Sequence, residues 1–277
     1  MIDLHLHTTA SDGRSSPEAL IHRAAAAGIT TLAVTDHDTT AGIAAARSAA
    51  APLGIAVVPG IEITSVHNGK DVHMLGYFID EAHPELAEFL VAQRADRRRR
   101  IEDMLDRLDS LGVVLDRTPV MSQAEGKGKA IGRPVIARAL IDGGHARDMS
   151  DAFDRYLSPD RPAFVPRLGA APAEVVALIT RAGGVSSFAH PLKLGLDGLI
   201  SDLARAGLDA VEVFHPDHDE AARARYQELA RECGLLVSGG SDDHGPGADR
   251  ADTLGTVSLP ALAFEALTAR ASGRRPA

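Results

Sequence analysis

The chain has 277 residues, of which 45% are hydrophobic and 24% charged, and its formal net charge is −9. This balance is typical of one large globular domain or a barrel with an insertion, and it excludes a disordered or fibrous chain. No apolar run approaches the roughly 20 residues of a membrane span, and no secretory signal opens the sequence. The single cysteine, Cys233, suits a reducing cytosol. We therefore expect a cytoplasmic protein that binds neither membranes nor, given its negative charge, duplex nucleic acid.

Strand-like runs alternate with helical runs near both ends of the chain. In chain order we expect strand 2–6, helix 17–27, strand 31–35, helix 40–53, strands 55–63 and 72–78, and later helix 172–181, strand 185–188, helix 199–206, strand 210–214, helix 220–233 and strand 235–238. Asn68 and Gly69 form a turn between the third and fourth strands. Repeated strand–helix units at this spacing predict a parallel sheet covered by helices, open or closed into a barrel.

The middle of the chain, about 85–167, lacks this alternation. A long helix is expected from about Pro84 to Leu111, followed by helices near 134–141 and 150–157. We interpret 85–167 as a mainly helical insertion that forms a substrate wall over a barrel made of 1–84 and 168–277. The arginine run 97–100 is interpreted as a solvated helix face paired with neighbouring acids.

Histidines and carboxylates gather where the expected strands end. Singly, each has an ordinary explanation, because a His-x-His pair can be a polar strand edge and an acid beside a histidine can cap a helix. The carboxyl ends of parallel strands meet at one edge, however, so these groups should converge. Their joint pattern predicts a metal site with nine candidate ligands: His5, His7, Asp12, His37, Glu62, His73, His190, Asp242 and His244.

Nine ligands exceed what a single ion uses, since catalytic sites leave positions open for water and substrate. We therefore expect two or three divalent ions, with Glu62 as a bridging carboxylate. The set holds nitrogen and oxygen ligands without a thiolate, which suits Mn²⁺, Fe²⁺ or Zn²⁺, and Mn²⁺ is favoured. Clustered ions of this kind activate water and neutralise phosphate oxygens, so the pattern predicts phosphoester hydrolysis.

Several motifs, in this order, resemble the polymerase and histidinol phosphatase (PHP) domain. They are Asp3-Leu4-His5-Leu6-His7, Ser11-Asp12-Gly13, Thr35-Asp36-His37-Asp38, Pro59-Gly60-Ile61-Glu62, His73-Met74-Leu75-Gly76-Tyr77, Ala189-His190-Pro191 and Gly240-Ser241-Asp242-Asp243-His244. The resemblance covers almost the whole chain apart from the insertion, and it implies an α/β fold, a distorted (β/α)₇ TIM-like barrel, with a trinuclear site. It implies one ion on His5, His7, Glu62 and Asp242, a second on Glu62, His73 and His190, and a third on Asp12, His37 and His244.

Gly132-Arg133-Pro134 followed by Ala137-Arg138-Ala139-Leu140 resembles a subgroup of small phosphoesterases within that family. Its members remove the 3′-phosphate of nucleoside 3′,5′-bisphosphates or trim short RNA from the 5′ end, and many carry His where this chain has Val135. Arg133 and Arg167 are candidate phosphate ligands, although Arg133 could instead start a helix and face solvent. His215 is a candidate proton donor to the leaving group. Alternatively, it contacts phosphate, or it orients a metal ligand without binding the metal itself.

The favoured hypothesis is thus a metal-dependent phosphoesterase acting on a small nucleotide or short single-stranded RNA. A histidinol-phosphate phosphatase would share the metal site and differ in the substrate wall. An amidohydrolase commonly uses a bridging lysine at a mid-barrel strand end, and none of the four lysines has that place. A catalytically silent metal-binding regulatory module would have lost ligands, and none of the proposed ligands is missing.

Overall fold

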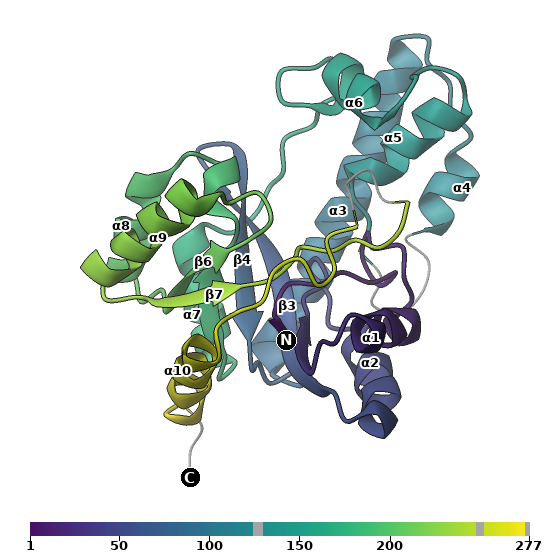
Figure 1. Ribbon diagram of the computed structural model, residues 1–277. Helices are drawn as coiled ribbons and strands as arrows, with labels where there is room; N and C mark the ends of the chain where they lie inside the picture. The colour runs from purple at the N-terminus through teal and green to yellow at the C-terminus, as the bar shows by residue number, and fades with distance from the viewer. Residues whose placement is uncertain (124–129, 248–251, 275–277) are drawn as a thin grey trace.

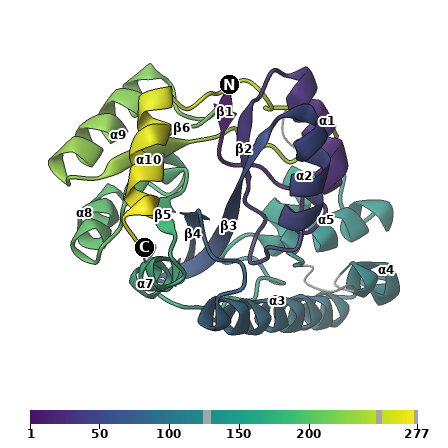
Figure 2. The same ribbon diagram turned by 90° about the horizontal axis from the view of Figure 1, so that it is seen from below.

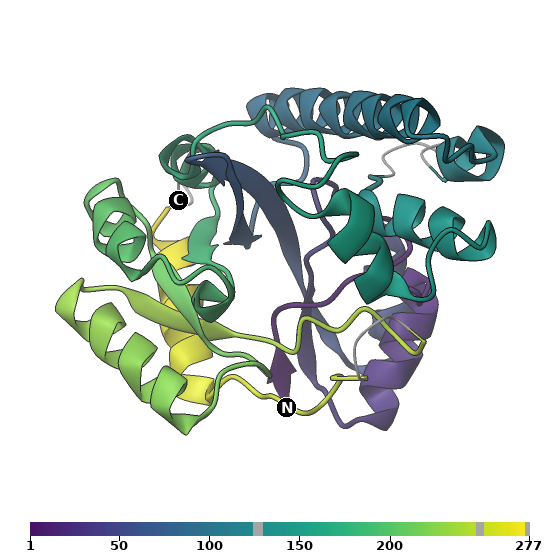
Figure 3. The same cartoon turned by 90° about the horizontal axis from the view of Figure 1, so that it is seen from above.

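The computed structural model describes residues 1–123, 130–247 and 252–274. At its centre lies one sheet whose seven strands follow each other in chain order, and the sheet curls strongly (Figures 2 and 3). A bridge between Leu6 and Asp243, and a hydrogen bond of 3.2 Å from the Leu4 amide to the Gly239 carbonyl, join the two edges. The expected α/β, distorted seven-stranded barrel is confirmed.

The strands run parallel to one another except for one. They are β1 (Ile2–Asp3), β2 (Thr31–Val34), β3 (Ala56–His67), β4 (Lys70–Tyr77), β5 (Val185–Phe188), β6 (Ala210–Phe214) and β7 (Leu236–Gly239). β4 pairs antiparallel with both β3 and β5, so the general expectation of a parallel sheet does not hold for this strand, whereas the expected turn at Asn68 and Gly69 is confirmed. The physical reason is the tight turn at Asn68 and Gly69, because a two-residue turn can join only antiparallel strands.

Helices cover the outside of the sheet, except that α10 (Ala261–Ser272) closes one end of the barrel, where Leu267 and Ala271 pack with the interior residues Leu4 and Leu75 (Figure 1). The outer helices are α1 (Pro17–Ala26), α2 (Ile43–Ala50), α7 (Pro172–Arg181), α8 (Asp197–Arg205) and α9 (Glu220–Glu232), with short turns η1 (Ala51–Leu53) and η3 (Pro191–Lys193). Ser16 caps α1 as its sequence predicts, since its hydroxyl accepts the Ala19 amide at 3.2 Å. α10 was not expected from the sequence. Only Leu267 and Ala271 of α10 are buried, so its apolar pattern is weak. None of the described helices is long and apolar enough to cross a membrane.

The described part of the segment between β4 and α7 consists of helices joined by irregular loops and contains no strand. It contains α3 (Pro84–Ser110), α4 (Arg117–Ser122), α5 (Arg133–Asp142), α6 (Met149–Ala152) and η2 (Phe153–Leu157). α3 is shared between two cores: Leu86 and Leu90 pack on the barrel, whereas Met104 and Leu108 pack with α4–α6. The far half of α3 therefore carries a second hydrophobic core beside the barrel (Figure 1).

Gly240 allows the end of β7 to lie directly against the residues that follow β1. A Cβ at this position would lie 2.3 Å from the His5 amide nitrogen and 2.4 Å from the His5 Cβ. We expect Gly240→Ala to lower the free energy of unfolding by about 1–3 kcal/mol, the usual cost of overpacking, in urea titrations. Gly198→Ala is the matched control, because its Cβ would meet nothing within 4 Å. An equal effect of both substitutions would contradict this close packing.

Candidate metal centre and anion pocket

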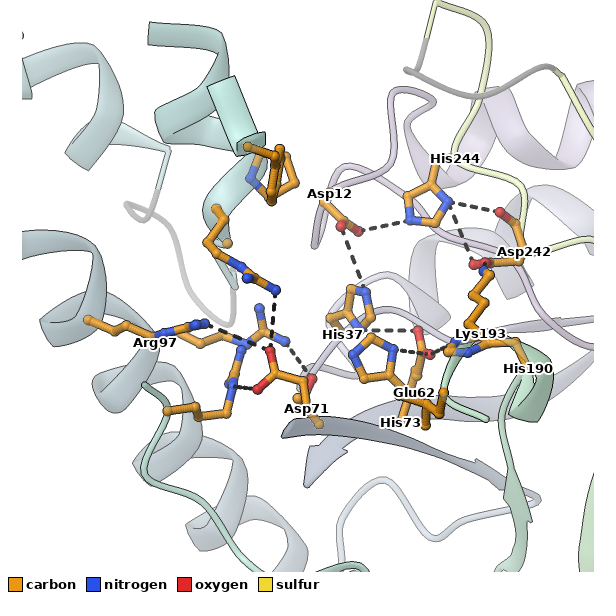
Figure 4. A pocket seen from close by; sticks show the side chains of 18 residues that line it. Asp12, His37, Glu62, Asp71, His73, Arg97, His190, Lys193, Asp242 and His244 are labelled. Carbon is orange, nitrogen blue, oxygen red and sulfur yellow. Dashed lines mark hydrogen bonds and ion pairs between the residues drawn. The ribbon is translucent and has the colours of Figure 1, made fainter. Parts of the chain in front are cut away.

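The structure brings all nine sequence-predicted ligands together at one end of the barrel. Three groups have candidate ligand atoms within 4.8 Å of one another: His7, Asp12, His37 and His244; His5, His7, Glu62 and Asp242; and His37, Glu62 and His73. The ninth residue, His190, joins through a contact of 3.1 Å between its Nε2 and Glu62 Oε1. Figure 4 shows seven of the nine pointing toward one another from separate strands and loops.

Glu62 lies at the middle of this cluster and is 1% exposed. Its Oε2 lies 3.4 Å from His5 Nε2, 3.2 Å from His7 Nε2 and 3.1 Å from His37 Nδ1. Its Oε1 lies 2.8 Å from His73 Nδ1. Both carboxylate oxygens therefore face imidazole nitrogens, and one carboxylate links all three groups.

Glu62 does not end its strand, contrary to the sequence prediction. β3 continues to His67, and His73 lies within the reversed strand β4, opposite Thr64. These two strands form a hairpin that extends past the ends of the other strands. Two of the nine candidate ligands thus come from the hairpin interior, while the others come from segments that follow β1, β2, β5 and β7.

The cluster holds buried polar atoms that no hydrogen bond satisfies. Among the described residues these include His5 Nε2, both ring nitrogens of His7, His37 Nδ1, His73 Nδ1 and Glu62 Oε2. Unsatisfied buried polar atoms are costly and rare. A divalent cation accepts electron pairs from imidazole nitrogen and carboxylate oxygen, so the donor set fits more than one such ion.

The charges of the cluster favour cations as well. Burial opposes ionisation of Glu62, but the neighbouring His37 and His73 outweigh it and hold the pKa of its carboxyl well below the usual range. Burial lowers the pKa of His190 to about 4, which keeps its ring neutral and able to donate a lone pair. Burial also opposes protonation of His7, yet contacts with Asp242 and Glu62 raise its pKa to about 10. The buried carboxylates thus attract positive charge into the cluster.

Two charged side chains outside the nine candidate ligands, Glu212 and Lys193, orient members of the cluster. Glu212 accepts from His5 Nδ1 at 2.9 Å and from the His190 amide at 2.7 Å. Asp242 directs Oδ1 toward His5 and His7, at 3.4 and 3.2 Å. The other oxygen of Asp242, Oδ2, lies 2.7 Å from Lys193 Nζ. Glu212 therefore orients His5 on one side of the cluster, and Lys193 orients Asp242 on the pocket side.

Arginines surround one carboxylate across the pocket from the histidines (Figure 4). Asp71 lies 3.5 Å from Arg133 Nη2, 3.7 Å from Arg167 Nε and 4.0 Å from Arg100 Nη1. Burial opposes ionisation of Asp71, but these cations outweigh it and lower the pKa of its carboxyl. The pocket between the two groups has a volume of about 330 Å³. One negative charge facing three guanidiniums leaves a surplus of positive charge beside the cluster.

Arg97 and Arg100 differ from their sequence interpretation as a solvated face. Their side chains are 7% and 4% exposed, and Arg97 donates to Asp38 Oδ2 at 2.6 Å and to Thr64 Oγ1 at 3.0 Å. Arg98 and Arg99, between them, do face solvent and pair with acids. The helical spacing of these residues could have predicted their burial, because positions 97 and 100 share a helix face with buried apolar positions.

The sequence-predicted substrate residues Arg133 and Arg167 both line the pocket. His215 does not line it; this residue lies behind Asp242, with Nε2 3.4 Å from Oδ2, and is 1% exposed. Asp71, Lys193 and Arg100 line the pocket but were not singled out from the sequence. Helix spacing could have marked Arg100, but nothing in the immediate sequence marks Asp71 or Lys193, because each is a lone charged residue without a motif of its own.

Proteins of known function are similar in sequence to this chain over most of its length. The 5′-3′ exoribonuclease Rnm of Escherichia coli (strain K12) is 37% identical over 253 residues, which are 88% of this chain and 85% of that protein. The 3′,5′-nucleoside bisphosphate phosphatase of Chromobacterium violaceum is 35% identical over 94% of this chain and 93% of its own. A model of the PHP domain matches residues 3–113. The chain belongs to the PHP domain family.

A crystal structure of a similar protein supports the fold over nearly the whole length of the chain. A Bifidobacterium adolescentis protein classed as a metal-dependent phosphoesterase superposes with a TM-score of 0.88 and 34% identity, covering 97% of this chain and 96% of that chain. The PHP domain match stops at residue 113, but this likeness extends through the helical segment and the last three strands. The chain is therefore a member of a family of metal-dependent phosphoesterases, which are hydrolases.

Proposed function

We propose that this PHP protein hydrolyses the 3′-phosphate of a nucleoside 3′,5′-bisphosphate, giving the nucleoside 5′-monophosphate, and that it also acts on short 5′-phosphorylated RNA. One observation carries the proposal: a single pocket has a histidine–carboxylate cluster on one side and an arginine group on the other. A substrate with two phosphates matches that division of charge. The names of the Escherichia coli and Chromobacterium violaceum relatives point to the same two substrate types.

The nine candidate ligands would hold two or three divalent ions, with Mn²⁺ favoured over Fe²⁺ or Zn²⁺. His5, His7, Glu62 and Asp242 would hold one ion, Glu62, His73 and His190 a second, and Asp12, His37 and His244 a third. When bound, such ions polarise the phosphate and activate water. Glu62 has oxygens facing both sides of the cluster, which is what a bridging ligand requires.

The arginine side of the pocket would hold the second phosphate. Arg100, Arg133 and Arg167 lie 3.5 to 4.0 Å from Asp71, which is too far for strong hydrogen bonds to that carboxylate. Arg100 Nη2 and Arg167 Nε are buried without a hydrogen-bond partner among the described residues. A phosphate offers the oxygens that planar guanidiniums bind best. Residues 85–167 would thereby act as an inserted substrate wall, because Arg100 and Arg133 come from α3 and α5.

His215 is best explained as a positioning residue for Asp242. The Asp217 amide donates to its Nδ1 at 3.0 Å, so the proton of the neutral ring lies on Nε2, which faces Asp242 Oδ2. A residue held behind a carboxylate does not reach the leaving group. Lys193 acts on the same oxygen from the pocket side.

We expect Lys193→Met to lower kcat/KM and metal affinity by about 10–100-fold, the usual effect of removing a partner of a metal ligand. The cause is loss of the charge that fixes Asp242 Oδ2. Metal titration followed by steady-state kinetics measures both quantities, and Lys193→Arg should recover part of the loss. Lys70→Met, at the exposed β3–β4 turn, is the control. Unchanged metal affinity in Lys193→Met would refute the positioning role.

The substrate assignment is tested with a panel. Protein loaded with Mn²⁺ is given adenosine 3′,5′-bisphosphate, histidinol phosphate and a short 5′-phosphorylated RNA, with His7→Ala as the control. Phosphate release from the bisphosphate that is lost in His7→Ala supports the proposal. Turnover of histidinol phosphate alone would assign the protein to that chemistry instead. No turnover with Mn²⁺, Fe²⁺ or Zn²⁺ would favour a silent metal-binding module.

A further inference from the structure

A second groove begins where the metal pocket ends. This groove, of about 300 Å³, lies between the loop after β1 and the start of α5, and it shares Asp12 and Pro134 with the metal pocket. A backbone hydrogen bond of 3.1 Å from the Ala130 amide to the Ala10 carbonyl holds its two sides together. We call it the exit groove and define it by the lining residues Thr9, Ser11, Arg14, Ile131, Val135 and Arg138.

The described lining of the exit groove carries charges of both signs. Asp12 is the carboxylate among its described lining residues, and it belongs to the candidate metal centre. Arg14 and Arg138 supply the other charges. Arg14 is exposed and pairs with no carboxylate of the described chain. Because the net charge of the protein is −9, two arginines in one groove are a local feature and do not reflect the charge of the whole surface. Such a groove attracts an anionic chain.

Beyond Val135 the exit groove opens onto an apolar surface between α4 and α5. That hollow, of about 340 Å³, shares Val135 and Arg138 with the exit groove, and its wall includes Val114 and Val120. Val114 is 71% exposed and offers an aliphatic surface at the edge of this hollow. The lining also includes the carboxylates of Asp116 and Asp142, so the hollow suits the base of a nucleotide rather than a second phosphate.

We propose that the exit groove binds the 3′ continuation of a single-stranded oligonucleotide, beyond the phosphodiester that lies at the metal cluster. This inference rests on the proposed function. In the proposed function, the arginines near Asp71 hold the terminal 5′-phosphate, and the next phosphate lies at the metal cluster. A bisphosphate ends at that point, whereas a longer chain must leave the pocket. Asp12 marks the exit, on a different edge of the pocket from Asp71 (Figure 4).

The same bond is broken in both substrates. Water adds to phosphorus, the bond from phosphorus to the 3′ oxygen breaks, and that oxygen takes up a proton. A bisphosphate then gives inorganic phosphate, whereas an oligonucleotide gives a nucleoside 5′-monophosphate and a shortened chain with a new 5′-phosphate. That new 5′-phosphate is the group that the arginine side of the pocket binds, so the exit groove would retain the chain between cleavages.

The test compares chain lengths. kcat/KM is measured on adenosine 3′,5′-bisphosphate and on 5′-phosphorylated RNA of two, three and five nucleotides, with Mn²⁺. We expect kcat/KM to rise at least about 5-fold from the dinucleotide to the pentanucleotide, since stacking and phosphate contacts each favour the longer chain. Arg14→Ala should remove most of that gain and change turnover of the bisphosphate little. Arg231→Ala on α9, whose side chain is 72% exposed, is the matched control.

Binding is measured separately, by fluorescence anisotropy of 3′-fluorescein oligonucleotides with metal-free protein, so that no hydrolysis interferes. Loss of one phosphate contact in Arg14→Ala should reduce the slope of log K against log salt by about 0.7. Length-dependent binding that Arg14→Ala weakens supports the exit groove, even if the bisphosphate is not hydrolysed and the proposed function fails. Binding that does not depend on length, or an equal loss in Arg231→Ala, would overturn the exit groove.

Discussion

Glu62→Gln should lower kcat/KM by about 10²–10³-fold, the range found when a single electrostatic group is removed from an active site. The amide keeps the shape of the side chain but loses the charge that faces His5, His7 and His37 through one oxygen and His73 through the other. Because this carboxylate is shared between the groups, the bound metal should also fall by at least one ion per chain. Elemental analysis of the purified, metal-loaded protein measures that content.

Glu102→Gln is the matched control for this substitution. Glu102 is 47% exposed on α3 and pairs with Arg98, far from the candidate ligands. The control should retain full metal content and activity. A Glu62→Gln protein with the wild-type number of ions would show that Glu62 does not join the groups, and the assignment of a bridging carboxylate would fail.

Arg97→Met should lower the free energy of unfolding by about 3–5 kcal/mol, because it leaves the buried carboxylate of Asp38 without its main partner. Arg97 donates to Asp38 Oδ2 at 2.6 Å, and Asp38 is 0% exposed. Arg167, whose Nη1 lies 3.6 Å from the same oxygen, is too far away to replace the lost hydrogen bond. Urea unfolding measured by circular dichroism gives the difference directly.

Arg98→Met is the matched control, because Arg98 lies next to Arg97 on the same helix but is exposed to solvent. Its side chain is 53% exposed, and its pair with Glu102 is an ordinary surface contact. The expected change is within about 0.5 kcal/mol. Equal effects at the two positions would mean that α3 does not hold Arg97 against the barrel as the structure shows.

The order of strands and the candidate ligands could be predicted because each depends on local sequence. Strand–helix alternation marks the barrel, and short motifs at the strand ends mark the histidines and acids. The Ser16 cap and the turn at Asn68 and Gly69 are equally local. In these places the residues that fix the structure are neighbours in the chain.

The remaining features depend on contacts between distant segments. The place of Glu62 within β3 follows from the hairpin, which extends beyond the rim of the barrel. Asp71 becomes part of the pocket only because α3, α5 and the segment before α7 bring arginines to it. Helix periodicity could have separated Arg97 from Arg98, but the buried acid that Arg97 meets is 59 residues away.

The most direct test of the account is to identify the nucleotide released from adenosine 3′,5′-bisphosphate by the Mn²⁺-loaded protein. The proposed function predicts adenosine 5′-monophosphate with one equivalent of phosphate, because in that proposal the arginines would hold the 5′-phosphate and the metal cluster would receive the 3′-phosphate. Release of adenosine 3′-monophosphate would reverse that orientation and contradict the account, and intact substrate after prolonged incubation with each metal would contradict the proposed activity itself.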